Sequence, residues 1–323
     1  MFSYLDLETK NGQRIDVWPV PYEGTVSFGR GTSQGPEAIL RASAEIETWD
    51  EELGLDLADL AHFITWPVFE PPVSGPEEVL KCMEEELASI CTPETFLLTL
   101  GGEHSVSLSP IRVYQGLFPD LAVLQIDAHA DLRESFQGSP YSHASVMARI
   151  RELGIPVAQI GIRSLCREES RLITRENEQG LLTMFAHDLP SPEQAAAQVR
   201  EFIGPRPLYI SFDADGLDPS IMPGTGTPEP GGLSFSWLSR FWPLFFGRCR
   251  LVGLDFCELS PLPGAGVVSE SVAVRCMNKI LTAYLKAHTE DRRQRAEDRG
   301  QRTEDRRLST EDRGQRTERK TKS

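Results

Sequence analysis

The stretch LQIDAHADLR (residues 124–133) decides how the rest of the chain is interpreted. An apolar run ends here, and Asp127, His129 and Asp131 then occupy alternate positions. Side chains two residues apart point to the same face of a strand, so we expect the three polar groups to share a face if the extended geometry persists. The pattern predicts a buried strand that delivers two carboxylates and an imidazole at its carboxyl end.

Other apolar runs predict further strands of the same sheet. Most of them are separated by helix-like stretches, an alternation typical of βαβ units. We therefore predict the α/β class, with a single three-layer α/β/α domain and a mainly parallel sheet over residues 1–288. Ligands of such folds bind beyond the carboxyl ends of the strands. The predicted strands are residues 95–102, 121–127, 157–162, 208–215 and 249–259, and the predicted helices are residues 76–90, 143–154, 191–204 and 269–287.

The composition changes at about Thr289. The triplet Glu-Asp-Arg recurs every seven residues from Glu290, and Leu308 is almost the only apolar residue in the segment. A coiled coil with that period would need apolar a and d positions. We therefore predict that residues 289–323 form a low-complexity charged repeat tail that is disordered. A nucleic-acid-binding arm is the alternative, which the even mixture of 12 basic and 9 acidic residues disfavours.

Charge and composition argue against several classes of function. The formal net charge is −15, and the body of the chain lacks the basic surface that a nucleic-acid-binding protein needs. No apolar run reaches the ~20 residues of a membrane span, and the N-terminus does not resemble a secretory signal. The six cysteines form no CxxC pair, so we expect reduced thiols and a cytoplasmic protein. An acidic surface steers cationic ligands, although it also simply promotes solubility.

Two more strand ends carry side chains of the same chemistry. YISFDADGLDP (209–219) places Asp213 and Asp215 after one apolar strand, and GGEHS (101–105) places His104 after another. Carboxylates ~4 Å apart repel by roughly 4 kcal/mol at an effective dielectric constant of 20, so four clustered aspartates need protons or cations. Oxygen and imidazole ligands without thiolate suit Mn²⁺ better than structural Zn²⁺, and two such ions can lower the pKa of a shared water. The sequence therefore predicts a binuclear metal site.

Several segments resemble the signature segments of the ureohydrolases, the arginase and agmatinase family. The resemblance covers about residues 15–287. It implies an arginase-like fold, two Mn²⁺ ions per chain, hydrolysis of a guanidinium group to urea and an amine, and a homo-trimer or homo-hexamer. The segments are GGEHS, DAHADLR (127–133), SFDADGLDPSIMPGTGTPEPGGLS (211–234), GLDFCELSP (253–261) and, toward the N-terminus, GTVSFGRGTSQGPEAILRAS (24–43).

The resemblance also implies which residues hold the metal ions. Asp127 and Asp213 bridge the two ions in this pattern. The first ion is held by His104, Asp127, Asp131 and Asp213, and the second by Asp127, His129, Asp213 and Asp215.

Catalytic and substrate-binding roles follow from the same resemblance. Glu258 matches the glutamate that pairs with the substrate guanidinium, which is a charge-assisted and often bidentate interaction. His143 matches a catalytic histidine that passes protons to the leaving amine, and a capping or core histidine is its alternative interpretation. Asp215 or Asp131 is expected to accept the proton that the nucleophile loses.

The remaining polar residues near these motifs have supporting roles. Glu103 and Asp255 match groups that hold the ligands in place, and Asp218 is expected to close a turn before Pro219. Three histidines lie outside any motif and are interpreted as ordinary surface or packing residues: His62, His187 and His288.

Two details place the pattern closer to agmatinase than to arginase. Glu229 and Pro230 form a pair typical of agmatinases, where arginases usually carry an apolar pair. The loop of residues 133–143 lacks the polar pattern with which arginases bind an α-amino acid. We therefore predict a small cationic guanidino substrate, agmatine, hydrolysed to putrescine and urea, with no nucleic-acid or membrane partner. The alternatives are guanidinobutyrase, aminopropylagmatine ureohydrolase, arginase or formiminoglutamase activity, a single-zinc deacylase, and a non-catalytic family member.

Overall fold

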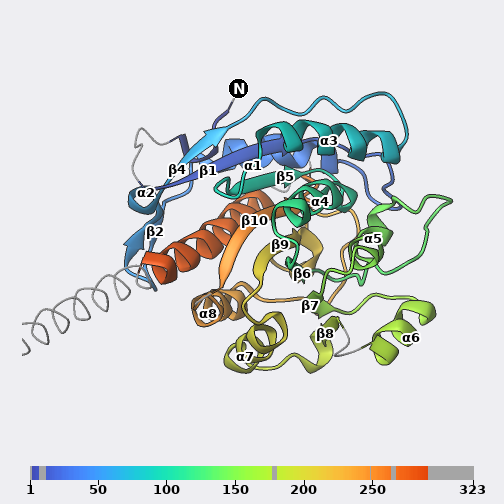
Figure 1. Cartoon of the computed structure of the whole chain (residues 1–323). Helices are drawn as coiled ribbons and strands as arrows, with labels where there is room; N and C mark the ends of the chain where they lie inside the picture. The colour runs from blue at the N-terminus through green and yellow to red at the C-terminus, as the bar shows by residue number, and fades with distance from the viewer. Residues whose placement is uncertain (1, 7–11, 177–179, 248, 263–266, 290–323) are drawn as a thin grey trace, which may run out of the picture.

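A parallel sheet of eight strands forms the centre of the protein (Figure 1). The computed structural model describes residues 2–6, 12–176, 180–247, 249–262 and 267–289. The strand order is β4-β1-β5-β10-β9-β6-β7-β8, and each neighbouring pair is parallel. The strands are β1 (Gln13–Val20), β4 (Ala61–Thr65), β5 (Leu97–Gly101), β6 (Ala122–Ile126), β7 (Val157–Ile162), β8 (Leu181–Phe185), β9 (Pro207–Asp213) and β10 (Arg250–Cys257). A separate antiparallel pair consists of β2 (Trp49–Asp50) and β3 (Leu55–Asp56).

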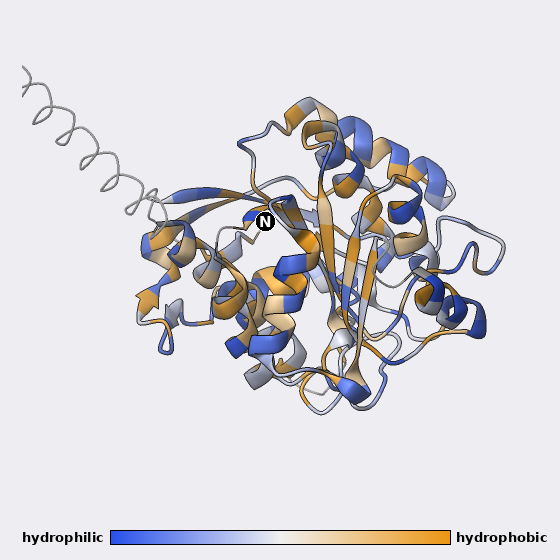
Figure 2. Ribbon diagram, turned by 60° about the horizontal axis from the view of Figure 1, so that its bottom comes forward, coloured by the Kyte–Doolittle hydropathy of each residue, from blue (hydrophilic) through white to orange (hydrophobic). Residues whose placement is uncertain are grey.

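Helices cover both faces of the sheet, which confirms the predicted three layers. Successive strand residues enter two different hydrophobic cores, as Val123 and Leu124 of β6 do. The core around Leu124 also contains side chains of α1 (Gly35–Ser43), α7 (Pro192–Ile203), α8 (Phe235–Phe245) and the helix of residues 268–289. The core around Val123 contains side chains of α3 (Pro76–Ile90), α4 (Leu108–Leu117), α5 (Val146–Glu152) and α6 (Arg167–Glu176). Figure 2 shows the mostly orange strands between helices that carry blue on their outer sides.

Short helical turns connect the larger elements. They are α2 (Leu57–Leu60) and the 3-10 turns η1 (Tyr4–Asp6), η2 (Thr32–Gln34), η3 (His104–Ser107), η4 (His143–Ser145), η5 (Ala186–Asp188) and η6 (Ala214–Gly216). Three of these turns (η3, η4 and η6) directly carry candidate site residues. No helix within the described residues is both long enough and apolar enough to cross a bilayer.

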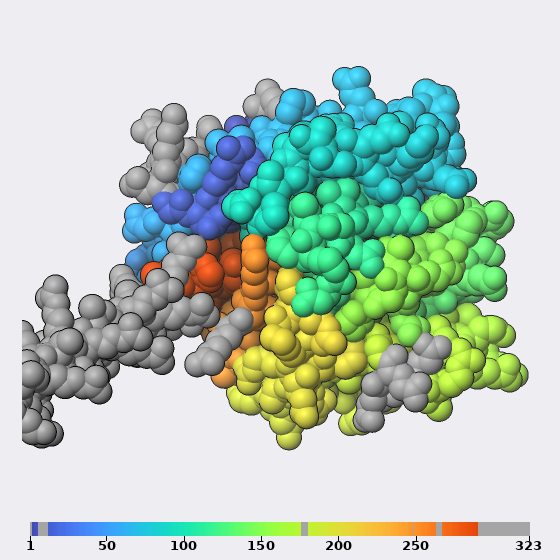
Figure 3. All heavy atoms as spheres, in the orientation of Figure 1, coloured from blue at the N-terminus to red at the C-terminus, as the bar shows by residue number. Residues whose placement is uncertain are grey.

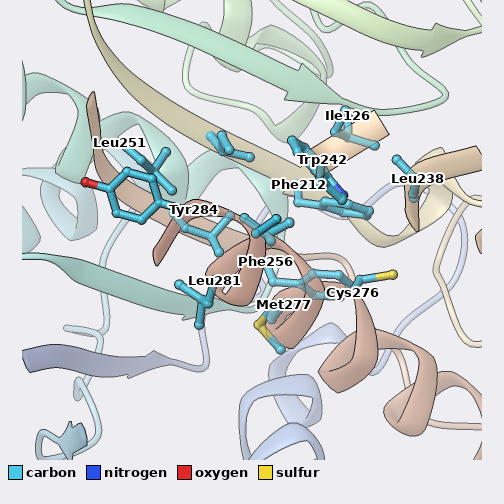
Figure 4. Packing of buried hydrophobic residues seen from close by; sticks show 14 of the residues in the cluster. Ile126, Phe212, Leu238, Trp242, Leu251, Phe256, Cys276, Met277, Leu281 and Tyr284 are labelled. Atoms are coloured by element: carbon cyan, nitrogen blue, oxygen red, sulfur yellow. The ribbon is translucent and has the colours of Figure 1, made fainter. Parts of the chain in front are cut away.

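Aromatic packing stiffens the middle of the sheet (Figure 4). Phe212 of β9 stacks on Phe256 of β10, with ring centroids 5.0 Å apart, and both side chains are fully buried. Trp242 of α8 is buried in the same core. Each such side chain contributes about 1.5–3 kcal/mol of transfer free energy. The strands that carry Asp213 and Glu258 are therefore held rigidly against each other.

The N-terminal segment contacts the C-terminal helix (residues 268–289). The hydroxyl of Tyr4 donates to Asn278 Oδ1 at 2.9 Å, which joins the two. Figure 3 shows the orange-red surface of this helix beside blue surface from the N-terminal part of the chain.

The predicted elements are all present, with bounds that differ by at most two residues. The predicted helix of residues 143–154 divides into η4 and α5. Three strands of the parallel sheet were not assigned from the sequence (β1, β4 and β8), because their runs are short or interrupted by polar residues and proline, and the short pair β2 and β3 was not assigned either. The predicted tail lies outside the described residues from position 290 onward.

Candidate metal and active site

The predicted ligands converge at the carboxyl edge of four neighbouring strands, β5, β10, β9 and β6. His104 follows β5, Asp213 ends β9 and Asp127 follows β6. The strands are parallel, so their carboxyl ends meet at one edge and residues far apart in sequence become neighbours. The structure thus brings together all six residues predicted as ligands.

The condition for a shared face, an extended geometry through Asp131, is not met. Strand β6 ends at Ile126, and Asp131 adopts a left-handed conformation with φ 53°. Asp215 lies in the turn η6 rather than in a strand. Glu258, just after β10, also has a positive φ of 62°. Such backbone conformations are uncommon for residues other than glycine and persist only where surrounding contacts hold them.

One cluster of ligand atoms surrounds the imidazole of His104. Its Nδ1 lies 2.9 Å from Asp131 Oδ2, 3.1 Å from Asp127 Oδ2 and 3.3 Å from Asp213 Oδ2. His104, Asp127 and Asp213 therefore present atoms close enough to share one ion.

The opposite nitrogen of His104 explains how the ring is oriented. Ser211 Oγ donates its hydrogen to Asp255 Oδ1 at 2.9 Å, so it accepts from His104 Nε2, which is also 2.9 Å away. Nε2 then carries a proton, and in the neutral ring, the form that can bind a metal ion, Nδ1 presents its lone pair toward the carboxylates. Oxygen acceptors and a lone pair that converge on one point suit a cation. The position of Asp255 agrees with the supporting role expected from the sequence.

A second cluster surrounds His129. Its Nδ1 lies 3.0 Å from Asp215 Oδ2 and 3.7 Å from Asp127 Oδ1. Asp215 Oδ2 also accepts a hydrogen bond from Thr227 Oγ1 at 2.9 Å. Asp127 belongs to both groups, with Oδ2 toward His104 and Oδ1 toward His129.

Burial and mutual repulsion strongly perturb these carboxyl groups. Burial raises the pKa of Asp213 well above its usual range, and the charges of Asp215 and Asp127 raise it further. Burial, followed by the charge of Asp127, raises the pKa of Asp131 to about 7. Without a metal ion these groups tend to hold protons.

Burial acts on the imidazoles in the opposite sense, but the neighbouring carboxylates raise their pKa values as well. Burial alone would lower the pKa of His129, but the charge of Asp215 and a hydrogen bond to Asp127 outweigh it and raise the pKa to about 12. Burial also opposes protonation of His104, yet hydrogen bonds to Asp127 and Asp131 raise its pKa well above the usual range. Protons thus occupy the place that divalent cations would take. The donor set of carboxylate oxygens and imidazole nitrogens fits two ions of the Mn²⁺ type.

A cavity of about 240 Å³ opens onto both groups of ligands. Glu258 lies in its wall, and Glu258 Oε1 accepts from the backbone N of His104 at 2.7 Å. Burial, followed by the charge of Glu103, raises the pKa of Glu258 well above its usual range. A guanidinium in the cavity would favour the charged carboxylate. The cavity is also lined by Ser27, Arg133, Phe136, His143, Ser164, Leu165, Glu169 and Thr227.

His143 is held at the cavity wall by hydroxyl groups. Thr25 Oγ1 donates to Glu103 Oε1 at 2.6 Å, so it can only accept from His143 Nδ1 at 3.3 Å. This leaves Nε2 as the acceptor nitrogen, 3.4 Å from Ser27 Oγ. Burial lowers the pKa of His143 to about 4. The ring is therefore neutral at pH 7, and it lies in the cavity wall.

Glu103 organises the segment that contacts His143. The buried carboxylate accepts from the backbone N of both Gly24 and Thr25, each at 2.6 Å. Glu103 thus supports the site, as the resemblance implies, by holding Thr25 against His143 rather than by contact with a ligand.

Several residues of the site were not assigned from the sequence. Ser211 and Gln125 each lie two positions before a ligand on a strand, so the period of two could have identified them. Thr25, Ser27 and Thr227 lie on loops that contact the site only through tertiary packing, and no local pattern marks them.

The residues predicted to lie outside the site do so. Asp218 closes a turn, because Oδ1 accepts from Ser220 N at 3.0 Å and Oδ2 accepts from Gly231 N at 2.9 Å. The cavity wall contains none of the three histidines outside the motifs, which are His62, His187 and His288.

Comparisons with known proteins agree with this geometry. The arginase family profile matches residues 13–282. An N(1)-aminopropylagmatine ureohydrolase of Thermus thermophilus is 39% identical over 249 residues, which cover 77% of this chain and 83% of the relative. An agmatinase of Pyrococcus horikoshii is 34% identical, with 75% and 82% covered. The solved structure of proclavaminate amidino hydrolase from Streptomyces clavuligerus superimposes with a TM-score of 0.79 at 28% identity, covering 89% of this chain and 98% of that chain.

Proposed function

We propose, because this chain belongs to the arginase family and is a ureohydrolase, that it hydrolyses the guanidinium group of agmatine to give putrescine and urea. One observation carries the proposal. The buried carboxylate of Glu258 lines the same cavity as the two His/Asp groups, so a guanidinium bound to Glu258 lies beside them. A carboxylate and a guanidinium form a charge-assisted pair that orients the carbon to be attacked.

Two Mn²⁺ ions are the proposed cofactors. The donor chemistry supports one ion held by His104 and Asp131 and a second held by His129 and Asp215. Asp127 and Asp213 would contribute to both sites. Bound there, the ions would supply a hydroxide nucleophile near neutral pH and stabilise the tetrahedral species formed on attack.

The side chains around the cavity perform the remaining steps. Glu258 binds the guanidinium and holds its plane. Asp215, whose Oδ2 also accepts from Thr227 at 2.9 Å, or Asp131 takes the proton that the nucleophile loses. His143 is neutral at pH 7 because burial lowers its pKa to about 4, so it relays a proton rather than holding one before turnover. Its acceptor nitrogen Nε2 receives the proton that Asp215 or Asp131 has taken from the nucleophile. The same nitrogen then delivers this proton to the departing amine.

A second candidate substrate is N(1)-aminopropylagmatine. The relative at 39% identity bears that activity in its name, whereas the agmatinase cited above is 34% identical. Both compounds present the same guanidinium and a cationic tail. The net charge of −15 of this protein favours the approach of such cations. They differ only in the length and charge of the part that points away from Glu258.

Urea release from a short panel of compounds tests the proposal. The Mn²⁺-loaded protein should show its highest kcat/KM on agmatine when compared with N(1)-aminopropylagmatine, 4-guanidinobutyrate and arginine. A higher value for N(1)-aminopropylagmatine selects the second candidate. Arginine as the best substrate contradicts both candidates, and no urea from any compound would identify a non-catalytic family member.

The oligomeric state and the cellular location are further parts of the proposal. We propose a homo-trimer or homo-hexamer from the family resemblance, and a cytoplasmic location from the six unpaired cysteines. The molecular mass in solution, measured by light scattering at several protein concentrations, tests the proposed oligomeric state.

A further inference from the structure

A row of polar side chains crosses the sheet beneath the candidate metal site. Gln125 of β6 is the register partner of Gln159 of β7, which in turn is the partner of Thr183 of β8. Both glutamines are fully buried. The preceding residues on the same face, Val123 and Val157, enter the hydrophobic core. Burying an amide is unfavourable unless its hydrogen bonds are made, so this row calls for a physical reason.

Every donor in the row has a partner. Gln159 Nε2 donates to Gln125 Oε1 at 2.6 Å and to the backbone O of Ala130 at 2.8 Å. Gln125 Nε2 donates to Asp127 Oδ2 at 2.6 Å and to the backbone O of His129 at 3.2 Å. Thr183 Oγ1 donates to Gln159 Oε1 at 2.8 Å. Both hydrogens of each amide are therefore used.

This pattern fixes the direction of the chain of hydrogen bonds. If the Gln125 amide were flipped, Oε1 would face the Asp127 carboxylate and the His129 carbonyl, and three acceptors would meet without a hydrogen. Gln159 prevents the flip, because its own amide is anchored on the Ala130 carbonyl. Gln125 can thus face Asp127 only as a donor.

This chain of hydrogen bonds acts on residues 127–131, the segment that carries three candidate ligands. Gln125 holds Oδ2 of Asp127, while the backbone N of His129 holds Oδ1 at 2.6 Å, so both carboxylate oxygens are fixed. The two carbonyls that accept from the glutamines belong to His129 and Ala130, directly before Asp131. Asp131 is the residue with the unfavourable positive φ of 53°.

We propose that the pair Gln159–Gln125 is a positioning device that keeps Asp127 and the 127–131 backbone in the geometry needed to bridge two metal ions. The inference rests on the proposed function only in taking Asp127 as a bridging ligand. Gln125 touches neither substrate nor metal and acts through Asp127. Loss of the Gln125 amide should lower the Mn²⁺ affinity and the magnetic coupling between the two ions, while the protein still folds.

The test uses the full-length protein and Mn²⁺ alone as the probe. Q125M keeps the length of the side chain but removes the donor, and Q125E also places a negative charge beside Asp127. T183V is the matched control, because it removes only the outermost hydroxyl and leaves Gln159 anchored on Ala130. Mn²⁺ affinity and stoichiometry are measured by titration of the chelated protein, and the electron paramagnetic resonance spectrum reports whether the two ions are magnetically coupled.

Q125M should bind the second Mn²⁺ about 10- to 100-fold more weakly than the wild type, with a weaker coupled-pair spectrum. Q125E should be affected more strongly and T183V should resemble the wild type. Circular dichroism and the melting temperature verify that each variant is folded. If Q125M does not fold, Q159M replaces it, since that change frees the Gln125 amide to flip without removing it.

Wild-type affinity and an unchanged coupled spectrum in the folded glutamine variant would overturn the positioning role. The same loss in T183V would also overturn it, because the effect would then be general destabilisation. A wild-type protein that binds no pair of ions contradicts the proposed function itself, and with it the premise of this inference. The two failures are thus distinguished by the wild-type titration.

Discussion

Ser211 Oγ lies 2.9 Å from His104 Nε2 and gives its own hydrogen to Asp255, so that His104 can turn only Nδ1 toward the carboxylates. The pair spans β9 and the turn after β5 and lies beneath the candidate metal site. A serine in the middle of a buried strand is thus explained by the orientation that it imposes on one imidazole.

Ser211→Ala should lower metal affinity by about 10- to 100-fold, because Nε2 loses its acceptor and the ring is free to rotate. Titration of the chelated protein with Mn²⁺ measures the change. Ser109→Ala is a matched control, since Ser109 is also buried but donates to the Leu80 carbonyl of α3 and contacts no candidate ligand through this bond. Equal affinities in the two variants would show that the Ser211 contact does not orient the ligand.

Asp127→Asn should lose both metal and turnover, whereas Glu258→Gln should retain metal and lose turnover. Asp127 belongs to both groups of ligand atoms, while Glu258 lines the cavity without belonging to either. Metal analysis of each purified variant, together with urea release, separates the two roles. Full activity in Glu258→Gln would contradict its contact with the guanidinium.

Metal binding should release protons, and Mn²⁺ affinity should rise with pH. In the absence of metal the pKa of Asp131 is raised to about 7 by burial and by Asp127, and the pKa of His129 is raised to about 12 despite burial. Both groups must lose their protons to act as ligands, so raising the pH through about 7 removes one competitor. Calorimetry in buffers of different ionisation enthalpy counts the protons released. Affinity that is independent of pH between 6 and 8 would refute the competition.

His143→Ala should lower kcat by roughly 10²- to 10⁴-fold with a small effect on KM, because the loss affects proton transfer rather than binding. Thr25→Val keeps the size of the residue but removes the hydroxyl 3.3 Å from His143 Nδ1, so that only the Ser142 hydroxyl, 3.4 Å away, remains near this nitrogen. It should lower kcat by roughly 10- to 100-fold through loss of the preferred tautomer.

Since the pKa of His143 is lowered to about 4 by burial, the ring stays neutral from pH 5 upward. An acidic limb in the kcat profile near pH 6 that disappears in His143→Ala would contradict this protonation state.

Phe212→Ala should lower the free energy of unfolding by about 3–5 kcal/mol, because it leaves a cavity against Phe256 at a fully buried position. Urea denaturation of the metal-free protein measures the loss. Phe235→Ala on the partly buried start of α8 is a control that should lose less. A loss below 1 kcal/mol in Phe212→Ala would mean that the aromatic stack does not stiffen the sheet.

Much of the fold and most of the candidate site could be predicted from local patterns. Apolar runs identified the strands that end at or directly before Asp127, Asp213 and Glu258, since a strand buried on both faces needs continuous hydrophobicity. Strands β1, β4 and β8 escaped prediction because a short apolar run looks the same in a strand and in a loop that packs on the core.

The sequence by itself determined which side chains follow the buried strands, because the run that fills a sheet and the polar residues after it are adjacent in the chain. Tertiary structure alone decided that β10 lies between β5 and β9, that Thr25 meets His143 and that Gln125 donates to Asp127. It also decided the positive φ of Asp131 and Glu258. These outcomes depend on which distant strands pack side by side to bury both faces of the sheet, and no short stretch of sequence contains that information.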